Sequence, residues 1–194
     1  MGKVLFFRKV SCSRDAAVPD AVPDAVPGLR SEFWRPSAYR LVPEGMRLFP
    51  FSVWWVFHFL RVFWSQEYCV FTVRDPRGRV VHHSVVTPGY LRFPFMKRGD
   101  LQIGNVWTAE DQRGKGLAVF GIRSILHACG RPGRTFWYLL EKENAASIRA
   151  AEKAGLELCG TGRRRSRLGI SVLGYYELTS GETESSAGAE GPPR

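Results

Sequence analysis

The segment DQRGKGLA, at residues 111–118, brings two glycines and two basic side chains together between two apolar runs. The run before it, LQIGNVWT, predicts a strand, and the run after it, LAVFGIRSILHACG, predicts a helix. A glycine-rich turn that opens a helix directs unpaired backbone N–H groups at one point. Gly114 and Gly116 let a ligand approach the backbone, and Arg113 and Lys115 add positive charge. The segment predicts a pyrophosphate-binding turn, with a solvated tight turn as the alternative.

Two common nucleotide-binding motifs do not match this segment. A P-loop has Ser or Thr after its Gly-Lys pair, whereas Lys115 is followed by Gly116 and Leu117. A dinucleotide fingerprint requires Gly-x-Gly-x-x-Gly in an early βαβ unit, and Gly114, Gly116 and Gly121 do not have that spacing.

The segment downstream repeats the strand-then-helix order. TFWYLLE predicts a strand, and NAASIRAAEKAGL predicts a helix with Asn144 as its N-cap and Gly155 after its end. Arg113-x-x-Gly116-x-Ala118 resembles the pyrophosphate-binding motif Gln/Arg-x-x-Gly-x-Gly/Ala of the GNAT N-acetyltransferase superfamily. The helix is similar to the one that follows in that superfamily, and the resemblance covers residues 66–179.

The resemblance implies that acetyl-CoA is the cosubstrate. Its pyrophosphate is expected on the backbone of residues 113–118, and its pantetheine arm beside the strand that ends at residue 108. The next helix would face the same arm. The cofactor-binding residues implied in this way are Val106, Trp107, Thr108, Arg113, Gly114, Lys115, Gly116, Leu117, Ala118, Asn144 and Ser147.

The reaction implied is attack of a primary amine on the thioester, through an oxyanion that backbone N–H groups stabilise. A lysine-like amine requires a base, whereas a less basic sugar amine requires less help. Candidate bases are Glu110, Glu141, His82 and His83, and adjacent histidines on a strand point to opposite faces. Many GNAT enzymes protonate the leaving thiolate with a tyrosine at the place of Ala151. The expected substitute is Tyr175, Tyr176 or a bound water.

The remaining elements predict an α/β (α+β) fold with a mixed, mostly antiparallel sheet of about seven strands and about four helices. MGKVLFFRKV predicts a first strand, and YCVFTVR and VVHHSVVT flank the turn DPRG in a hairpin. SEFWRPSAYRL and FSVWWVFHFLRVFW predict early helices. In the second, Val53, Phe57, Leu60 and Trp64 repeat at helical spacing, and the remaining aromatics go nearly all the way round. RRRSR, at 163–167, predicts a turn between two last strands.

The domain organisation follows from composition. We expect one GNAT-like domain at 1–180, which contains a Pro-rich linker at about 13–30. The small, polar residues at 181–194 predict a disordered tail. Four dispersed cysteines, without metal-ligand spacing, predict reduced thiols, a cytoplasmic location and no metal site.

The net charge of +10 favours an anionic partner. The apolar stretch 48–64 is short and contains Pro50, His58 and Arg61, which argues against a transmembrane span and leaves peripheral membrane contact open. Nucleic acid is not favoured, because no strand carries the spaced aromatics of an RNA-binding platform.

The expected acceptor is a small primary amine. RFPFM with DLQIGNVWT resembles GNAT proteins of bacterial surface-polysaccharide assembly, which indicates an amino sugar of a glycan precursor, and RRRSR suits a phosphorylated or nucleotide-linked one. One alternative is a protein N-acetyltransferase of the ribosomal-protein type, favoured by Ser147. The other is a non-catalytic acyl-CoA-binding or membrane-surface module, which Ala151 and the apolar segment around Trp55 permit.

Overall fold

The computed structural model describes residues 3–11, 28–167 and 170–180. The predicted Pro-rich linker therefore lies outside the described residues except at 28–30, and the predicted tail lies wholly outside them.

The described residues form one eight-stranded sheet with the order β2-β3-β4-β5-β6-β1-β7-β8. Every neighbouring pair is antiparallel except β5 and β6, which run parallel. The predicted fold class is confirmed, with one strand more and one helix fewer than expected within this part of the chain. The strands are β1 Val4–Val10, β2 Arg30–Trp34, β3 Cys69–Arg74, β4 Val80–Pro88, β5 Leu101–Thr108, β6 Thr135–Glu141, β7 Glu157–Arg167 and β8 Ile170–Ser180.

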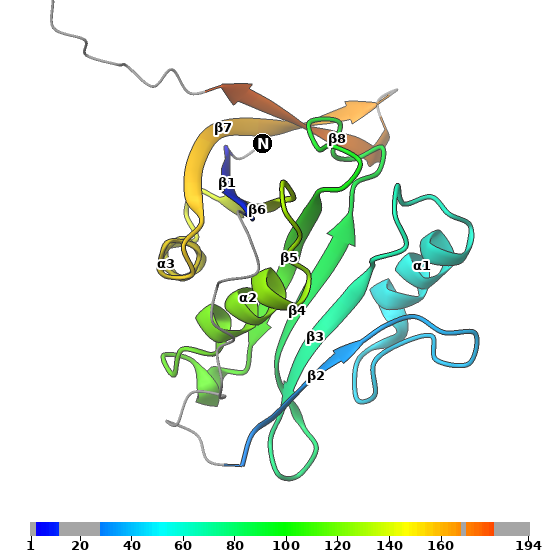
Figure 1. Cartoon of the computed structure of the whole chain (residues 1–194), viewed down its shortest axis with the longest axis vertical. Coiled ribbons are helices and arrows are strands. Elements are labelled where there is room, and N and C mark those ends of the chain that lie inside the picture. Colours follow the sequence, from blue (N-terminus) through cyan, green and yellow to red (C-terminus); the bar gives the residue numbers. More distant parts are fainter. Residues whose placement is uncertain (1–2, 12–27, 168–169, 181–194) are drawn as a thin grey trace, which may run out of the picture.

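The helices cover the two faces of the sheet. Helices α2 (Leu117–Ala128) and α3 (Ala145–Lys153) pack on one side, and α1 (Leu48–Phe59) packs on the other (Figure 1). The main core lies beneath α2 and α3, where Ile122 and Ile125 of α2 meet Phe71 of β3 and Ile103 of β5. A short 3₁₀ turn, η1 (Glu110–Gln112), joins β5 to the glycine segment. Within the described residues, no helix is long and apolar enough to cross a membrane.

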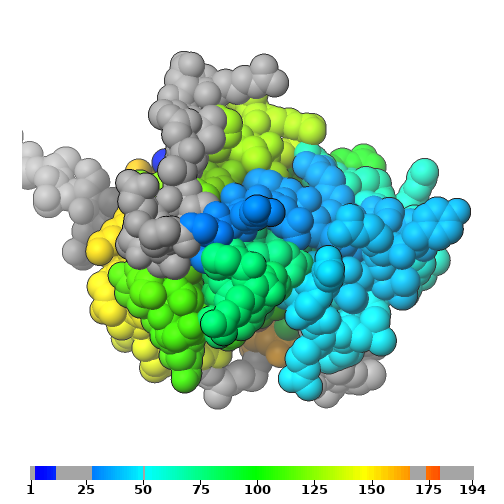
Figure 2. Space-filling view, turned by 90° about the horizontal axis from the view of Figure 1, so that it is seen from below, coloured from blue at the N-terminus to red at the C-terminus, as the bar shows by residue number. Residues whose placement is uncertain are grey.

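The predicted hairpin around DPRG is confirmed. The amide of Gly78 donates to the carbonyl of Asp75 at 2.9 Å, which closes the turn between β3 and β4. Figure 2 looks onto this turn, with η1 and the glycine segment beside it. Arg79 of the hairpin forms an ion pair with Asp111 of η1 at 2.6 Å, so the hairpin holds the start of the glycine segment in place.

The prediction of a helix at SEFWRPSAYRL is wrong, because the first part of this segment is strand β2. Phe33 packs into the core beneath α2, whereas Trp34 packs into the aromatic cluster beneath α1. Successive side chains therefore point to opposite faces, as in a strand. Pro36 also lacks the N–H that a continuing helix would require.

The predicted helix at FSVWWVFHFLRVFW is confirmed as α1, but the helical repeat read from the sequence is only partly buried. Phe51, Trp54 and Phe57 pack against the sheet, whereas Val53 is 37% exposed and Leu60 is 71% exposed. Because this helix is apolar on all sides, its sequence periodicity does not identify the face that the sheet covers.

The arginine run at 163–167 was predicted as a turn and instead belongs to β7, so that prediction is wrong. Arg163 and Arg165 lie 3.7 and 2.9 Å from the same carboxylate oxygen of Glu177 on the paired strand β8. This cross-strand pairing offsets the repulsion between neighbouring arginines, which lets the run extend as a strand.

Candidate functional site

Strands β5 and β6 separate in the middle of the sheet. They pair from Leu101 with Phe136 to Ile103 with Tyr138, and their pairing then ends. On its other edge, β5 continues to pair with β4 as far as Thr108. The backbone of β5 beyond Ile103 therefore faces a gap on its β6 side instead of a neighbouring strand.

A bulge lies in β5 at the start of this gap. The pairing with β4 shifts between Val85, opposite Gly104, and His83, opposite Trp107, so β5 contains one extra residue there. Asn105 adopts a left-handed backbone with φ of 45°, which asparagine tolerates better than most residues. The bulge turns the β5 backbone at the point where the sheet opens.

A groove of about 560 Å³ lies along the open end of β5, against the starts of α2 and α3. Every cofactor-binding residue that the sequence predicted lines it except Lys115, whose Nζ donates to Gln112 at 3.1 Å. The lining residues are Val106, Trp107, Thr108, Gln112, Arg113, Gly114, Gly116, Leu117, Ala118, Val119, Tyr138, Asn144, Ala146, Ser147, Arg149, Ala150 and Lys153.

The glycine segment has the backbone that the sequence predicted. Gly114 and Gly116 have φ of 78° and 80°, a conformation that side chains disfavour, and Gly116 is the N-cap of α2. The first amides of α2 therefore face the groove without partners in the helix. Arg113 on one wall and Arg149 and Lys153 on the other add positive charge, and none of the lining residues is acidic. This arrangement favours a phosphate-bearing ligand.

Helix α3 forms the second wall of the groove. The Oδ1 of Asn144 accepts the N–H of Ser147 at 3.1 Å, which confirms the predicted N-cap. Sequence reasoning missed Ala146, Arg149 and Ala150, although their spacing from Lys153 places all four on one helical face. It also missed Tyr138, whose position at the groove depends on the end of the β5–β6 pairing.

Tyr138 is a buried tyrosine of this groove. Burial raises its pKa, and this effect outweighs the smaller, opposite influence of Ser147. The phenol therefore keeps its proton at neutral pH. Ala151, at the place of the usual tyrosine of the GNAT superfamily, is completely buried in the core.

His82 and His83 point to opposite faces of the sheet, as predicted. His82 has no exposed surface, because it lies beneath α2 with its Nδ1 2.9 Å from Thr108 Oγ1 and its Nε2 3.0 Å from Ser84 Oγ. Burial lowers its pKa to about 3, with a smaller contribution from His83. His82 was a candidate base, and the structure places it where no acceptor reaches it.

His83 instead faces a cavity on the α1 side of the sheet. Its ring stacks on Trp107, with centroids 5.4 Å apart, and burial lowers its pKa to about 4. His83 is therefore neutral at pH 7. It pairs with Trp107, directly beside the bulge in β5.

The other candidate catalytic residues lie at the edges of the site. Glu110 is highly exposed and pairs with Arg113 at 3.5 Å. Glu141 is the exposed last residue of β6, and its carbonyl accepts the N–H of Asn144 at 3.0 Å. Tyr175 lies half-buried on β8 opposite Arg165. Tyr176 lines a different cavity from the one that His83 faces, and this cavity is called the second cavity.

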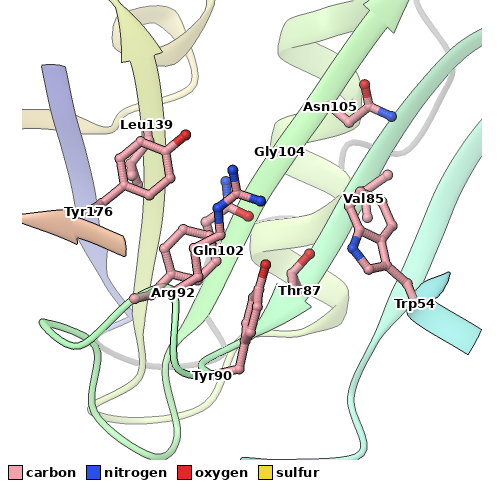
Figure 3. Close-up of a pocket in the computed structure, with 11 residues that line it drawn as sticks. Trp54, Val85, Thr87, Tyr90, Arg92, Gln102, Gly104, Asn105, Leu139 and Tyr176 are labelled. Atoms are coloured by element: carbon pink, nitrogen blue, oxygen red, sulfur yellow. The ribbon is translucent and has the colours of Figure 1, made fainter. Parts of the chain in front are cut away.

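The second cavity, of about 240 Å³, lies on the α1 side of the same gap (Figure 3). Gly104 and Leu139 line it, whereas their neighbours on the two strands face α2 and α3. The gap between β5 and β6 is therefore bordered by a cavity on each face of the sheet. The lining residues of the second cavity are Trp54, Val85, Thr87, Tyr90, Arg92, Phe93, Gln102, Gly104, Asn105, Leu139 and Tyr176.

No protein-family model matches the sequence, and no curated protein matches it. Solved structures do match the fold. A GCN5-related N-acetyltransferase from Sphaerobacter thermophilus is 15% identical over 82% of this chain and 49% of its own, with a TM-score of 0.52. An acetyltransferase of the GNAT family from Colwellia psychrerythraea is 13% identical over 81% of this chain and 53% of its own, with a TM-score of 0.51.

A tandem GNAT protein from the clavulanic acid biosynthesis pathway is 15% identical over 81% of this chain and 50% of its own, with a TM-score of 0.52. The chain therefore spans about half the length of these proteins. Its fold is the fold of the GNAT acetyltransferases, as the sequence motifs predicted.

Proposed function

We propose that the protein is an acetyl-CoA-dependent N-acetyltransferase that acts on a primary amine of a small acceptor. The observation that carries this proposal is the groove at the gap between β5 and β6, where a positively charged glycine turn lies at the end of an unpaired strand edge. The fold likeness to GNAT acetyltransferases supports acyl transfer from a coenzyme A thioester.

The two ends of the groove suit two parts of the coenzyme. The pyrophosphate would lie on the amides that follow Gly114 and Gly116, near Arg113, where the start of α2 favours negative charge. The amide-containing arm would continue the sheet along Val106 and Thr108, because β6 no longer occupies that edge. The thioester would then reach the bulge at Asn105.

The gap lets an amine approach the thioester from the opposite face of the sheet. An acceptor in the second cavity would attack the thioester carbonyl, and a backbone N–H of the β5 bulge would stabilise the oxyanion. Collapse of the intermediate releases the coenzyme A thiolate and forms an amide. Catalysis then depends on holding the amine and the thioester close together in the orientation for attack. Such positioning supplies a large part of the rate enhancement.

Two proton transfers complete the reaction. Glu110 and Glu141 remain the carboxylates proposed as bases, and because neither lines the groove or the second cavity, each would act through a bridging water. Tyr138 is the proposed proton donor to the thiolate, because it lines the groove with its phenol protonated. A sugar amine loses its proton more easily than a lysine does, so an amino sugar of a glycan precursor suits a site without a buried carboxylate base.

The proposal includes a cytoplasmic location. The free cysteines Cys69, Cys129 and Cys159 agree with a reducing compartment.

The first test is the thermal unfolding midpoint of the full chain with and without acetyl-CoA. Ligand at 100 times its dissociation constant adds about 2.7 kcal/mol, which corresponds to a rise of roughly 5 to 10 °C for a chain of this size. Gly114→Val and Arg113→Ala should abolish the rise. Gly133→Val is the matched control, because Gly133 has φ of 76° and open space around its Cα, as Gly114 does.

If Gly114→Val and Gly133→Val both lose the rise in midpoint, backbone strain alone explains the loss. No rise in the parent chain at millimolar acetyl-CoA would overturn the proposed function. A rise without acetylation of any amine would favour the non-catalytic acyl-CoA-binding module, and acetylation of a peptide amine in preference to sugar amines would favour the ribosomal-protein type of activity.

A further inference from the structure

The second cavity has a distinct chemical composition. Aromatic rings of Trp54, Tyr90 and Tyr176 form much of its wall, and Thr87, Gln102 and Asn105 supply neutral polar groups. Arg92 supplies a positive charge, and none of the residues that line the cavity is acidic. Figure 3 shows the guanidinium of Arg92 in the middle of the cavity, between Tyr176 and Tyr90.

The position of Arg92 is fixed from several directions. It lies in the loop between β4 and β5, and its carbonyl accepts the N–H of Tyr176 on β8 at 2.9 Å. Its guanidinium carbon lies 5.5 Å from the centre of the Tyr176 ring. Tyr90 lines the same cavity. A guanidinium held in this way is pre-organised for a ligand, so little side-chain entropy is lost when one binds.

The hydrogen-bonding capacity of Arg92 is not filled. Its Nε is buried and has no hydrogen-bond partner among the described residues. A buried donor without an acceptor is costly and rare in folded proteins. Arg92 therefore lines the cavity with its hydrogen-bonding capacity only partly used.

The surrounding charges also favour a negatively charged ligand. Arg164 of β7 is the cross-strand partner of Tyr176, so a second positive group lies near the same wall. The carboxylate of Glu177, next to Tyr176 in sequence, pairs with Arg163 and Arg165 instead. An anion in the cavity would be attracted, whereas an acceptor with a second positive charge would be repelled.

We propose that the acceptor carries an anionic group, a phosphate or a carboxylate, which Arg92 binds while the primary amine reaches the gap between β5 and β6. This inference rests on the proposed function for the fate of the amine. The planar guanidinium binds such oxyanions through two parallel N–H groups, and the aromatic walls suit the apolar face of a small ring. At about 240 Å³, the cavity is smaller than the sites of drug-sized ligands, roughly 300 to 1,000 Å³. It therefore suits a small amine.

The test compares three amines that share one ring and differ in charge. Glucosamine 6-phosphate carries a phosphate, muramic acid carries a carboxylate, and glucosamine carries neither. Acetylation is followed as release of the coenzyme A thiol by the full chain, with kcat and KM measured for each amine. The two anionic amines distinguish phosphate from carboxylate as the preferred group.

The variants are Arg92→Gln, Arg92→Lys and the matched control Arg98→Gln. Arg98 lies in the same loop but is exposed and does not line the cavity. We expect an anionic amine to exceed glucosamine at least tenfold in kcat/KM, because a charge-assisted hydrogen bond contributes at about that level. Arg92→Gln should remove this preference through KM, Arg92→Lys should keep part of it, and Arg98→Gln should keep all of it.

An unchanged preference in Arg92→Gln would overturn the inference, as would faster acetylation of glucosamine than of both anionic amines. The acetyl-CoA thermal shift is measured in every variant, and its persistence in Arg92→Gln shows that the fold and the coenzyme site are intact. If the proposed function fails and no amine is acetylated, calorimetric titration with glucosamine 6-phosphate decides the inference separately. Binding at least tenfold weaker in Arg92→Gln than in Arg98→Gln supports an anion site, and equal or absent binding refutes it.

Discussion

Ile103 of β5 and Tyr138 of β6 form the last residue pair before the two parallel strands separate. Ile103 points into the core, whereas Tyr138 reaches the groove that the separation opens. The bulge at Asn105 follows within two residues on β5. The point where β5 and β6 stop pairing thus positions both Tyr138, the proposed proton donor, and the backbone at Asn105 that would face the thioester.

Tyr138→Phe should lower kcat about 10- to 100-fold if the phenol protonates the leaving thiolate, because a positioned general acid contributes at least at this level. The dissociation constant of acetyl-CoA should change less than kcat does. The measurement is steady-state kinetics with a thermal shift for coenzyme binding. Tyr175→Phe is the matched control, since Tyr175 is the tyrosine that the sequence favoured. A large fall in kcat for Tyr175→Phe alone would reverse the assignment.

Asn105→Val should lower the free energy of unfolding by about 1 to 2 kcal/mol, because a β-branched residue is disfavoured at a left-handed φ of 45°. Asn105→Gly should be close to neutral in stability, because glycine adopts this conformation without strain. Urea unfolding of both variants measures the difference. Equal stabilities would show that the bulge relaxes when its side chain changes.

The parts of the site that the sequence predicted correctly have local signals. Gly114 and Gly116 are required by a backbone of positive φ, and Asn144 is a preferred N-cap residue, so each residue type follows from its own few neighbours. The strand before the turn and the helix after it follow from their own periodicity. These local rules identified the groove because its walls are two consecutive strand-to-helix junctions.

The parts that the sequence did not predict depend on contacts between distant segments. Tyr138 reaches the groove because β6 stops pairing with β5, and Arg92 is fixed by Tyr176, which lies far along the chain. The difference between His82 and His83 depends on which face α2 covers. No local sequence pattern shows which distant segments come into contact. For the same reason, the apolar sequence of α1 does not show which of its faces the sheet covers.

Asn144→Ala should destabilise the protein by about 1 kcal/mol, because it removes the side-chain acceptor for the N–H of Ser147. Asn144→Asp keeps an acceptor and should keep the stability, but its charge should weaken acetyl-CoA binding, since Asn144 lines the groove. Chemical denaturation and coenzyme titration of both variants separate the two effects. Unchanged coenzyme binding in Asn144→Asp would place the coenzyme away from the start of α3.

Gly121→Ala should destabilise the protein by about 1 to 2 kcal/mol, although alanine normally favours a helix. A Cβ at this position in α2 would overlap Nε2 of His82 and would lie 3.3 Å from Ser84 Oγ. His82 cannot move away without breaking its hydrogen bonds to Ser84 and Thr108. In an His82→Ala background the same change should cost less, and a double-mutant cycle measures this coupling. Additive effects would show that α2 shifts instead.

The free energy of unfolding should fall as the pH is lowered from 7 to 5. The folded-state pKa of His82 is about 3 and that of His83 about 4, both below the ordinary value of 6.5. The unfolded chain therefore binds protons in this range that the folded chain does not, so stability is complete above about pH 6.5 and is lost as the pH falls toward the folded-state values. Burial of His82 alone corresponds to about 2 kcal/mol at pH 5. His82→Gln, which cannot titrate, should reduce the slope, and urea unfolding at a series of pH values measures it. A flat profile between pH 7 and 5 in the parent chain would show that the histidines reach water, and would return His82 to the candidate bases.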